Sequence, residues 1–140
     1  MSESALTDDH FCFACGENNP DGLRIAFEYP EPGRCRAAFT PERRFQGWQD
    51  ILHGGIIATL LDEGLAHAYG GADRGGGEAA VTAELCVRFK KPVRIGRPIV
   101  LEGRVVSIEG RVIEGQSRIL DQDGTELASA TGKLIKIKKP

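Results

Sequence analysis

A histidine followed by two glycines, with an aspartate nine residues after the histidine, has the residue types and spacing best suited to chemistry in this chain. These residues lie in ILHGGIIATLLDEG, residues 51–64. The first N–H groups of a helix lack internal partners and carry the positive end of its dipole. Glycine also lets a ligand approach that backbone closely. The N–H of Gly54 or Gly55 is therefore suited to hold a carbonyl oxygen on which negative charge develops.

Two side chains complete this chemistry. His53 can add a hydrogen bond to the same oxygen, and Asp62, inside an apolar helix, can attack a carbonyl or activate a water molecule. Nine residues of helix rise about 13 Å and make about two and a half turns, so one straight helix cannot bring both side chains to one substrate atom. Two-fold pairing of antiparallel helices would do so. We therefore expect two sites per dimer, each combining His53 and Gly54 of one chain with Asp62 of its partner. Such a site suits hydrolysis of an ester or thioester.

The surrounding sequence predicts one helix and six strands. Small and aliphatic residues recur at helical spacing over about residues 53–69 and cover so wide a face that this helix should be mostly buried. Gly70 is available for a left-handed cap at its end. The loop 41–51 carries two aromatic side chains expected to anchor it, Phe45 and Trp48. Strands are indicated by alternation of apolar and polar residues. They are expected at residues 23–29, 35–40, 80–89, 98–108, 111–120 and 126–137.

The predicted order of elements is β-β-α-β-β-β-β. Because only one long helix exists and it is apolar nearly all round, one antiparallel sheet must curl around it. This is the hotdog fold, an α+β arrangement in which a curved sheet wraps a single central helix. A Rossmann fold would need alternating strands and helices, which this order lacks. The 140 residues are the size of one domain, which we expect to span 1–140 with a loose N-terminal segment at 1–10.

The composition argues against several classes of partner. A formal net charge of −2 gives no general attraction to nucleic acids or membranes. The longest uncharged run, residues 51–61, is too short and too rich in glycine to span a bilayer. The polar, acidic N-terminus has no apolar region typical of a signal peptide. We therefore expect a cytoplasmic protein with reduced cysteines and with neither nucleic acid nor membrane as a partner.

The stretch FQGWQDILHGGIIATLLDEG, followed by AVTAELCVRFKKPVRIGRPIVLEGRVV, resembles the hotdog-fold acyl-CoA thioesterases. It is most similar to their phenylacetate-pathway and 4-hydroxybenzoyl-CoA thioesterase-like branch, and CFACGENNPDGLRI looks like the opening of a subgroup. The resemblance covers about residues 11–135. It implies hydrolysis of an acyl-CoA thioester to a free acid and coenzyme A, with no cofactor apart from the coenzyme A of the substrate. It also implies a homodimer with sites at its interface, often paired into tetramers.

The resemblance also implies roles for individual residues. Asp62 matches the family's nucleophile or general base, and the two roles stay open. Gly54 matches the glycine whose N–H polarises the thioester carbonyl, and His53 matches the histidine beside it. Thr82 matches a Ser or Thr that helps to place the attacking water, from the same chain as Asp62. Simple alternation puts Thr82 on the face opposite its apolar neighbours, so this role requires a bend at the start of its strand.

One position departs from the family pattern. Some relatives carry Asn or Gln six residues before the histidine, where this chain has Gly47, and Gln46 is the candidate to replace that contact. Basic residues around Pro92 are candidates to bind the phosphates of coenzyme A, with a solvated strand end as the alternative. The predicted substrate-binding set is Gly55, Gln46, Arg88, Lys90 and Lys91.

Other readings of the sequence stay open. A non-catalytic acyl-CoA binding or sensing protein would use the same fold, and a hotdog hydratase acting on enoyl thioesters is a further alternative. The sequence does not identify the acyl group. Glu63 and His67 are expected in surface or packing roles.

The N-terminus also contains a C-x-x-C motif, Cys12 and Cys15. A zinc site normally takes four ligands, and no second such pair follows in the sequence. His10 and Cys35 are the further ligands considered from sequence. We therefore predict no metal site.

Overall fold

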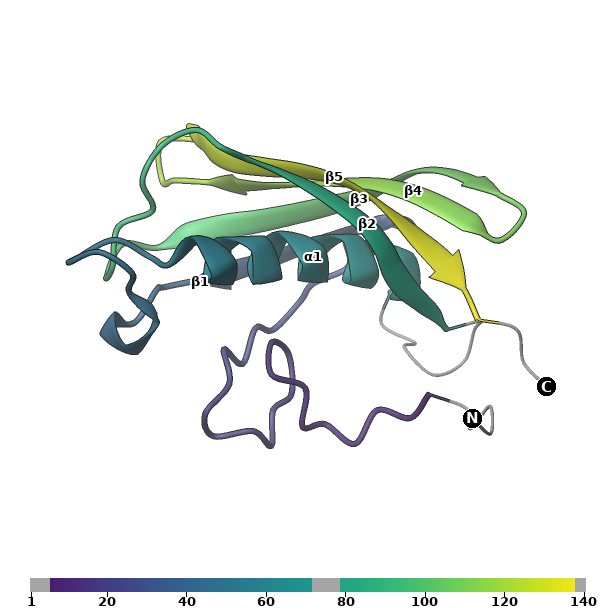
Figure 1. Cartoon of the computed structure of the whole chain (residues 1–140), viewed down its shortest axis with the longest axis horizontal. Helices are drawn as coiled ribbons and strands as arrows, with labels where there is room; N and C mark the ends of the chain where they lie inside the picture. The colour runs from purple at the N-terminus through teal and green to yellow at the C-terminus, as the bar shows by residue number, and fades with distance from the viewer. Residues whose placement is uncertain (1–5, 72–78, 138–140) are drawn as a thin grey trace.

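The computed structural model describes residues 6–71 and 79–137. One curved antiparallel sheet lies over one side of a single long helix, and an N-terminal segment without regular structure runs along another side (Figure 1). The five strands are ordered β1-β3-β4-β5-β2 in the sheet. The hotdog fold expected from the sequence is confirmed. The elements are β1 (Arg34–Phe39), the 3-10 helix η1 (Arg43–Phe45), α1 (Gly54–Gly70), β2 (Ala80–Phe89), β3 (Ile99–Glu109), β4 (Val112–Leu120) and β5 (Glu126–Lys136).

The first expected strand, residues 23–29, is reduced to one bridge. Glu28 pairs with Arg36 of β1, with N–O distances of 2.7 and 2.9 Å between their backbones. Arg24 has a φ of 54°, in the left-handed region, and this interrupts the extended backbone. The N–H of Ile25 then donates to a carbonyl of the N-terminal segment (2.9 Å) instead of a strand partner. The segment therefore covers the helix more than it extends the sheet.

The helix α1 ends one residue later than its glycines predict. Gly71, with a φ of 59°, takes the left-handed position, and its N–H donates to the carbonyl of His67 (2.8 Å). The sequence also predicts a flexible cap in the glycine-rich stretch GGADRGGG, residues 70–77, most of which lies outside the described residues. In the part of the chain that the structure describes, no helix is both long and apolar enough to cross a membrane.

Glycines let α1 lie directly against the sheet. A Cβ added to Gly103 of β3 would lie 2.0 Å from the carbonyl oxygen of Gly64 in α1, a distance that no real Cβ tolerates. A Cβ added to Gly132 of β5 would lie 2.6 Å from the side chain of Leu65. We call Gly64, Gly103 and Gly132 the glycine seat. It sets the depth at which the helix rests on the sheet.

Polar side chains of the sheet donate hydrogen bonds to backbone carbonyls of α1 where the helix packs on the sheet. The buried Ser117 hydroxyl donates to the carbonyl of Leu61 (2.7 Å), and the Cys35 thiol donates to that of Gly64 (3.1 Å). Burial raises the pKa of Cys35 to about 12, so this thiol keeps the proton that it donates. These bonds add direction to the packing of the apolar helix face.

Strand β2 forms one edge of the sheet. Its pairing with β5 shifts between Thr82 and Glu84, which marks a β-bulge near the start of the strand. Its apolar residues do not all face the core as simple alternation predicts, because Val81 and Phe89 are 41% and 59% exposed. Within the described chain, no strand pairs with the outer side of β2. We call this side, with Val81 and Phe89, the open edge.

Candidate active site

The start of α1 is built by His53, which occupies the N-cap position. Its Nδ1 accepts a hydrogen bond from the N–H of Gly55 (2.8 Å). A Cβ on Gly55 would lie 3.0 Å from that Nδ1, so glycine is the residue that fits this cap without displacing the ring. The Gly55 N–H, one of two expected to hold a substrate oxygen, is therefore occupied within the chain.

This cap decides which donors remain for a ligand. Because Nδ1 of His53 accepts a hydrogen bond, the neutral ring carries its proton on Nε2 and can donate from there. The N–H of Gly54, the first residue of the helix, has no hydrogen-bond partner among the described residues. The ring of Phe89 lies beside it, with Cε1 3.5 Å from the position of an added Gly54 Cβ. The N–H of Gly54 thus lies close to an aromatic ring of the open edge, and the Nε2–H of the preceding residue, His53, is a second donor.

The loop before α1 supports His53 from the other side. A Cβ on Gly47 would lie 3.2 Å from the Cα of His53, so the loop packs closely on the cap. Gln46, the candidate for a substrate contact, accepts the N–H of Asp50 through its Oε1 (3.3 Å) and so braces the loop. The anchoring role expected for Phe45 holds, since this ring is buried, whereas the same expectation for Trp48 is wrong because its side chain is 85% exposed.

Asp62 lies further along α1 and contacts the edge strand. Its Oδ1 accepts a hydrogen bond from the hydroxyl of Thr82 on β2 (2.7 Å). The β-bulge between Thr82 and Glu84 provides the bend that the sequence required for this side chain to turn towards the helix. The structure therefore brings together two of the four residues assigned to catalysis.

The surroundings of Asp62 make its carboxylate a stronger base. Burial raises the pKa of this carboxyl above its usual range, and the negative charge of Glu63 raises it further. The hydrogen bond from Thr82 acts in the opposite direction, because it favours the ionised form. A partly buried carboxylate held by one hydroxyl has the features expected of a general base.

The two halves of the candidate site do not meet within one chain. Gly54 is the first residue of the continuous helix α1 and Asp62 is the ninth. At 1.5 Å per residue the backbones of these two residues are about 12 Å apart along the axis. The carbonyl-binding donors and the carboxylate therefore form two separate half-sites on one helix.

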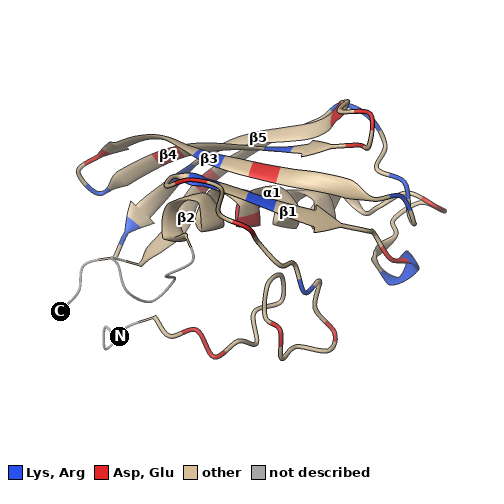
Figure 2. Ribbon diagram, turned by 180° about the vertical axis from the view of Figure 1, so that it is seen from behind, with Lys and Arg blue, Asp and Glu red and all other residues tan. Residues whose placement is uncertain are grey.

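The basic residues predicted to bind coenzyme A lie at one end of β2. Arg88 is near the end of the strand, and the N–H groups of Lys90 and Lys91 both donate to the carbonyl of Leu127. Lys90 also forms an ion pair with Glu126. Lys and Arg occur on the loops at the end of the molecule that carries η1 (Figure 2). All three basic side chains lie on exposed residues and remain candidates for an anionic ligand.

Comparison with known proteins identifies the family. The thioesterase superfamily matches residues 49–128, which include both half-sites. The chain belongs to this superfamily. A bovine (Bos taurus) relative, acyl-coenzyme A thioesterase THEM4, is 32% identical over 84 residues, which cover 58% of this chain and 32% of that protein. The chain thus spans about a third of the length of this relative.

Solved structures of other proteins share the fold. Protein RHA08564, a thioesterase superfamily protein, is 31% identical with a TM-score of 0.71, covering 82% of this chain and 57% of that one. The smu.793 protein of Streptococcus mutans UA159, solved bound to acetyl-CoA, is 21% identical with a TM-score of 0.72, covering 82% and 90%. The family and the fold expected from the sequence are thereby confirmed.

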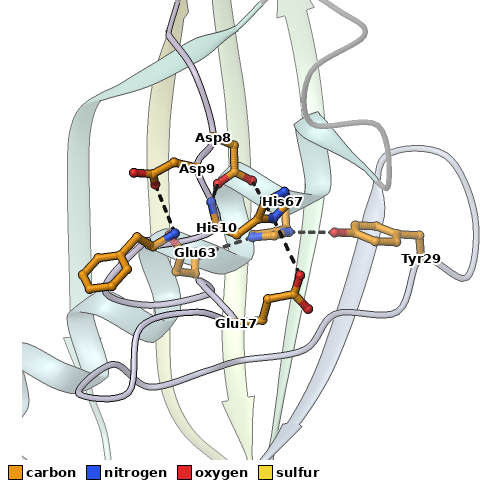
Figure 3. A network of polar contacts seen from close by, with 8 residues as sticks. Asp8, Asp9, His10, Glu17, Tyr29, Glu63 and His67 are labelled. Atoms are coloured by element: carbon orange, nitrogen blue, oxygen red, sulfur yellow. Dashed lines mark hydrogen bonds and ion pairs between the residues drawn. The ribbon is translucent and has the colours of Figure 1, made fainter.

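One group of residues was missed by sequence reasoning. The side chains of Glu63 and His67 are only 12% and 5% exposed, so of the surface or packing roles expected for them only packing agrees with the structure. Tyr29 of the N-terminal segment holds the His67 ring on the side away from Glu63 (Figure 3). Cys12 and Cys15 approach Glu63 from the same segment. We call these five residues the closed cluster. The signals in the sequence were the acid–histidine spacing of four on one helix and the C-x-x-C motif.

Proposed function

We propose that this chain is an acyl-CoA thioesterase that hydrolyses a thioester to a free acid and coenzyme A, with two sites at the interface of a homodimer. The observation that carries the proposal is the hydrogen bond from Thr82 to the partly buried Asp62, on a helix whose first N–H is available for a carbonyl oxygen. The curated bovine relative is an acyl-coenzyme A thioesterase, and smu.793 was solved bound to acetyl-CoA. Both support coenzyme A thioesters as the substrate class.

In the proposed reaction, the Gly54 N–H and the Nε2–H of His53 hold the thioester oxygen as it becomes negative. Asp62 of the partner chain takes a proton from a water molecule positioned by Thr82, and the resulting hydroxide attacks the carbonyl carbon. The tetrahedral intermediate then collapses, the C–S bond breaks, and the thiolate of coenzyme A leaves and is protonated. Direct attack by Asp62, through an anhydride that water hydrolyses, uses the same residues.

The position of both half-sites beside β2 supports a shared site. Gly54 lies next to Phe89 at one end of the strand, and Asp62 lies next to Thr82 near the other end. In a two-fold antiparallel pairing of two β2 strands about the midpoint between Leu85 and Cys86, Thr82 of one copy would lie opposite Phe89 of the other. The open edge would then be covered, and the donors of one chain would face the carboxylate of its partner. A homotetramer would pair two such dimers.

Both half-sites and the substrate class are tested by one panel of assays. Aryl, short-chain and long-chain acyl-CoAs are incubated with the wild-type chain and with Asp62→Ala, and the released acid is measured by chromatography. We expect hydrolysis of at least one class, and a loss of about 100-fold or more in Asp62→Ala. If acyl-CoA binds but no member of the panel is hydrolysed, the chain is a non-catalytic acyl-CoA binding protein and the proposed enzyme activity is wrong. Sedimentation of an active monomer would contradict the shared site.

A further inference from the structure

Three groups that bind metals well converge beside α1, outside the candidate active site. The sulfur atoms of Cys12 and Cys15 and a carboxylate oxygen of Glu63 all lie within 4.8 Å of one another. None of the cysteines of this chain is in a disulfide. The two thiols come from the N-terminal segment and the carboxylate from the helix, so the fold itself brings them together. Both cysteines are half-buried and the Glu63 side chain is only 12% exposed, so the three groups are largely shielded from solvent.

The C-x-x-C turn has the backbone of a thiolate-binding loop. The N–H of Ala14 donates to the Cys12 sulfur (3.4 Å), which fixes the direction of this side chain within the turn. The N–H of Gly16 donates to the Cys12 carbonyl (2.9 Å) and closes the turn. A Cβ on Gly16 would lie 2.2 Å from the backbone nitrogen of Cys12, so only glycine permits this closure. The turn therefore holds its shape without help from regular secondary structure.

His67 supplies a fourth group on the helix side. Its Nδ1 is 2.7 Å from the hydroxyl of Tyr29, and its ring stacks on Phe27 with centroids 3.9 Å apart. The Nε2 atom is buried, has no hydrogen-bond partner, and lies 3.2 Å from Oε2 of Glu63. A metal-binding histidine typically donates its other ring N–H to an oxygen, which is the role that Tyr29 fits. In the tautomer with the proton on Nδ1, Nε2 would present a lone pair towards the Glu63 carboxylate, and a cation between them would bind both groups.

We propose that the closed cluster binds a zinc ion through Cys12, Cys15, Glu63 and His67, with Tyr29 orienting the histidine. Two thiolates, one carboxylate and one imidazole are a tetrahedral ligand set that suits Zn²⁺ and does not suit Mg²⁺ or Ca²⁺. Zn–S bonds of about 2.3 Å place ligand atoms about 3.3–3.8 Å apart, so the two thiols and the Glu63 carboxylate, which lie within 4.8 Å of one another, would close by up to about an ångström on binding. His67 adjoins this group through Glu63, 3.2 Å from its Nε2. The two further ligands suggested by the sequence have other partners. His10 lies beside Asp8 and Glu17, and the Cys35 thiol donates to the carbonyl of Gly64.

The proposed ion would fasten the N-terminal segment to α1. This segment has no strand or helix among residues 6–33 and few backbone bonds to the sheet, so ligand bonds would add to the packing of Ala14, Leu23 and Ile25 in the core. A ligand that binds only the folded chain raises its stability in proportion to the logarithm of ligand concentration over Kd. The proposal is separate from thioester hydrolysis, and its test does not depend on that activity.

The experiment measures metal content and spectra of the untagged full chain. Zinc is determined by mass spectrometry of the purified protein, and chelated, reduced protein is then titrated with Co²⁺. We expect one zinc per chain, and with Co²⁺ the thiolate charge-transfer absorption and the intense visible bands of a tetrahedral site, both removed by Zn²⁺. Cys12→Ser and Glu63→Gln should weaken Co²⁺ binding by about 100-fold or more, because loss of a ligand costs at least as much as loss of an outer-shell partner.

Cys86→Ser is the matched control, since Cys86 is exposed on β2, and it should bind Co²⁺ as the wild type does. Circular dichroism verifies that each variant is folded. If Cys12→Ser does not fold, Glu63→Gln still tests the proposal. A reduced wild-type chain that shows no tetrahedral cobalt spectrum would overturn the proposal. So would Co²⁺ binding of wild-type strength in Cys12→Ser. If the reduced chain binds no metal and the oxidised chain forms a Cys12–Cys15 disulfide, the motif is a redox pair instead of a metal site.

Discussion

Asp62 and Glu63 are neighbours in the sequence, but their side chains lie on different sides of α1 and contact different segments. Asp62 points to the edge strand, where its carboxylate accepts one hydrogen bond from Thr82 beside the open edge. Glu63 points to the N-terminal segment, where two thiols lie within 4.8 Å of its carboxylate and His67 lies 3.2 Å away. Successive helix residues point about 100° apart, so this separation follows directly from helix geometry.

One helix thus carries residues of two proposed sites of different kinds. The closed cluster draws all its members from a single chain, because a covering segment folds over that side of α1. The Asp62 side has no such cover within the described chain, and its carbonyl-binding donors lie at the far end of the helix. The proposed metal site therefore draws its ligands from one chain, whereas the proposed hydrolytic site would require a second copy.

The largest expected effect separates the two acids by function. Asp62→Asn should lower kcat about 1000-fold, because the amide cannot accept a proton from water. The same variant should keep zinc, whereas Glu63→Gln should lose it. Turnover and metal content measured on both variants test this double separation. An Asp62→Asn chain with more than a tenth of wild-type kcat would remove Asp62 from the chemistry.

The next effect concerns the start of the helix. Gly54→Pro removes the N–H expected to hold the oxyanion, while proline is tolerated at the first position of a helix. We expect kcat to fall about 100-fold. Gly54→Ala is the control, since it keeps the N–H and its Cβ would lie at an ordinary 3.5 Å from Phe89.

Mixed dimers then test whether the two halves come from different chains. A dimer of one Gly54→Pro chain and one Asp62→Ala chain keeps one intact pair of half-sites. It should recover about half of the wild-type activity per dimer if sites are shared between the two chains. Verified heterodimers with no recovered activity would contradict the shared geometry.

A smaller effect is expected at Thr82. Thr82→Val keeps the shape of the side chain and removes the 2.7 Å hydrogen bond to Asp62. Because hydrogen bonds to charged groups are worth about 1.5–3 kcal/mol, kcat should fall about tenfold or somewhat more with KM little changed. Thr82→Ser should restore the rate. A serine variant as slow as the valine variant would show that packing, not the hydroxyl, is what matters there.

The smallest effect is expected at the basic end of β2. An exposed ionic contact is worth up to about 1 kcal/mol, so Lys91→Glu should raise KM for an acyl-CoA about fivefold and leave kcat unchanged. The effect should shrink as salt is added. Lys133→Glu is the control, because this exposed lysine pairs with Glu114 and Glu84 in the strand register, far from residue 91. Equal changes in the two variants would leave the basic cluster without a role in binding.

Local patterns in the sequence predicted most of the fold. The helix and the last four strands begin and end within one residue of their predicted positions, because each shows its own periodicity and ends at turn-forming residues. The strand predicted at 23–29 was wrong in extent because Arg24 takes a left-handed φ, which alternation of residue types does not reveal. The bend needed at Thr82 was predicted, and the β-bulge provides it.

Long-range contacts were less accessible to sequence reasoning. The hydrogen bond between Nδ1 of His53 and the Gly55 N–H depends on one rotamer at a helix start, so the sequence could not say which glycine N–H stays available. The closed cluster brings Cys12 close to Glu63 although the two are far apart in the sequence, and no local pattern of residue types predicts that contact. The sequence lacks the second pair of cysteines common in zinc sites, whereas the fold offers a glutamate and a histidine one helical turn apart.

The glycine seat makes both sites depend on one backbone contact. With 2.0 Å between an added Gly103 Cβ and the carbonyl oxygen of Gly64, even one methyl group would lift α1 from the sheet by about an ångström. The lift would draw Asp62 away from Thr82 and change the approach of Glu63 to the two thiols at the same time. The contact between Gly103 and Gly64 therefore fixes the position of α1 for both proposed sites, and a side chain at position 103 would disturb both.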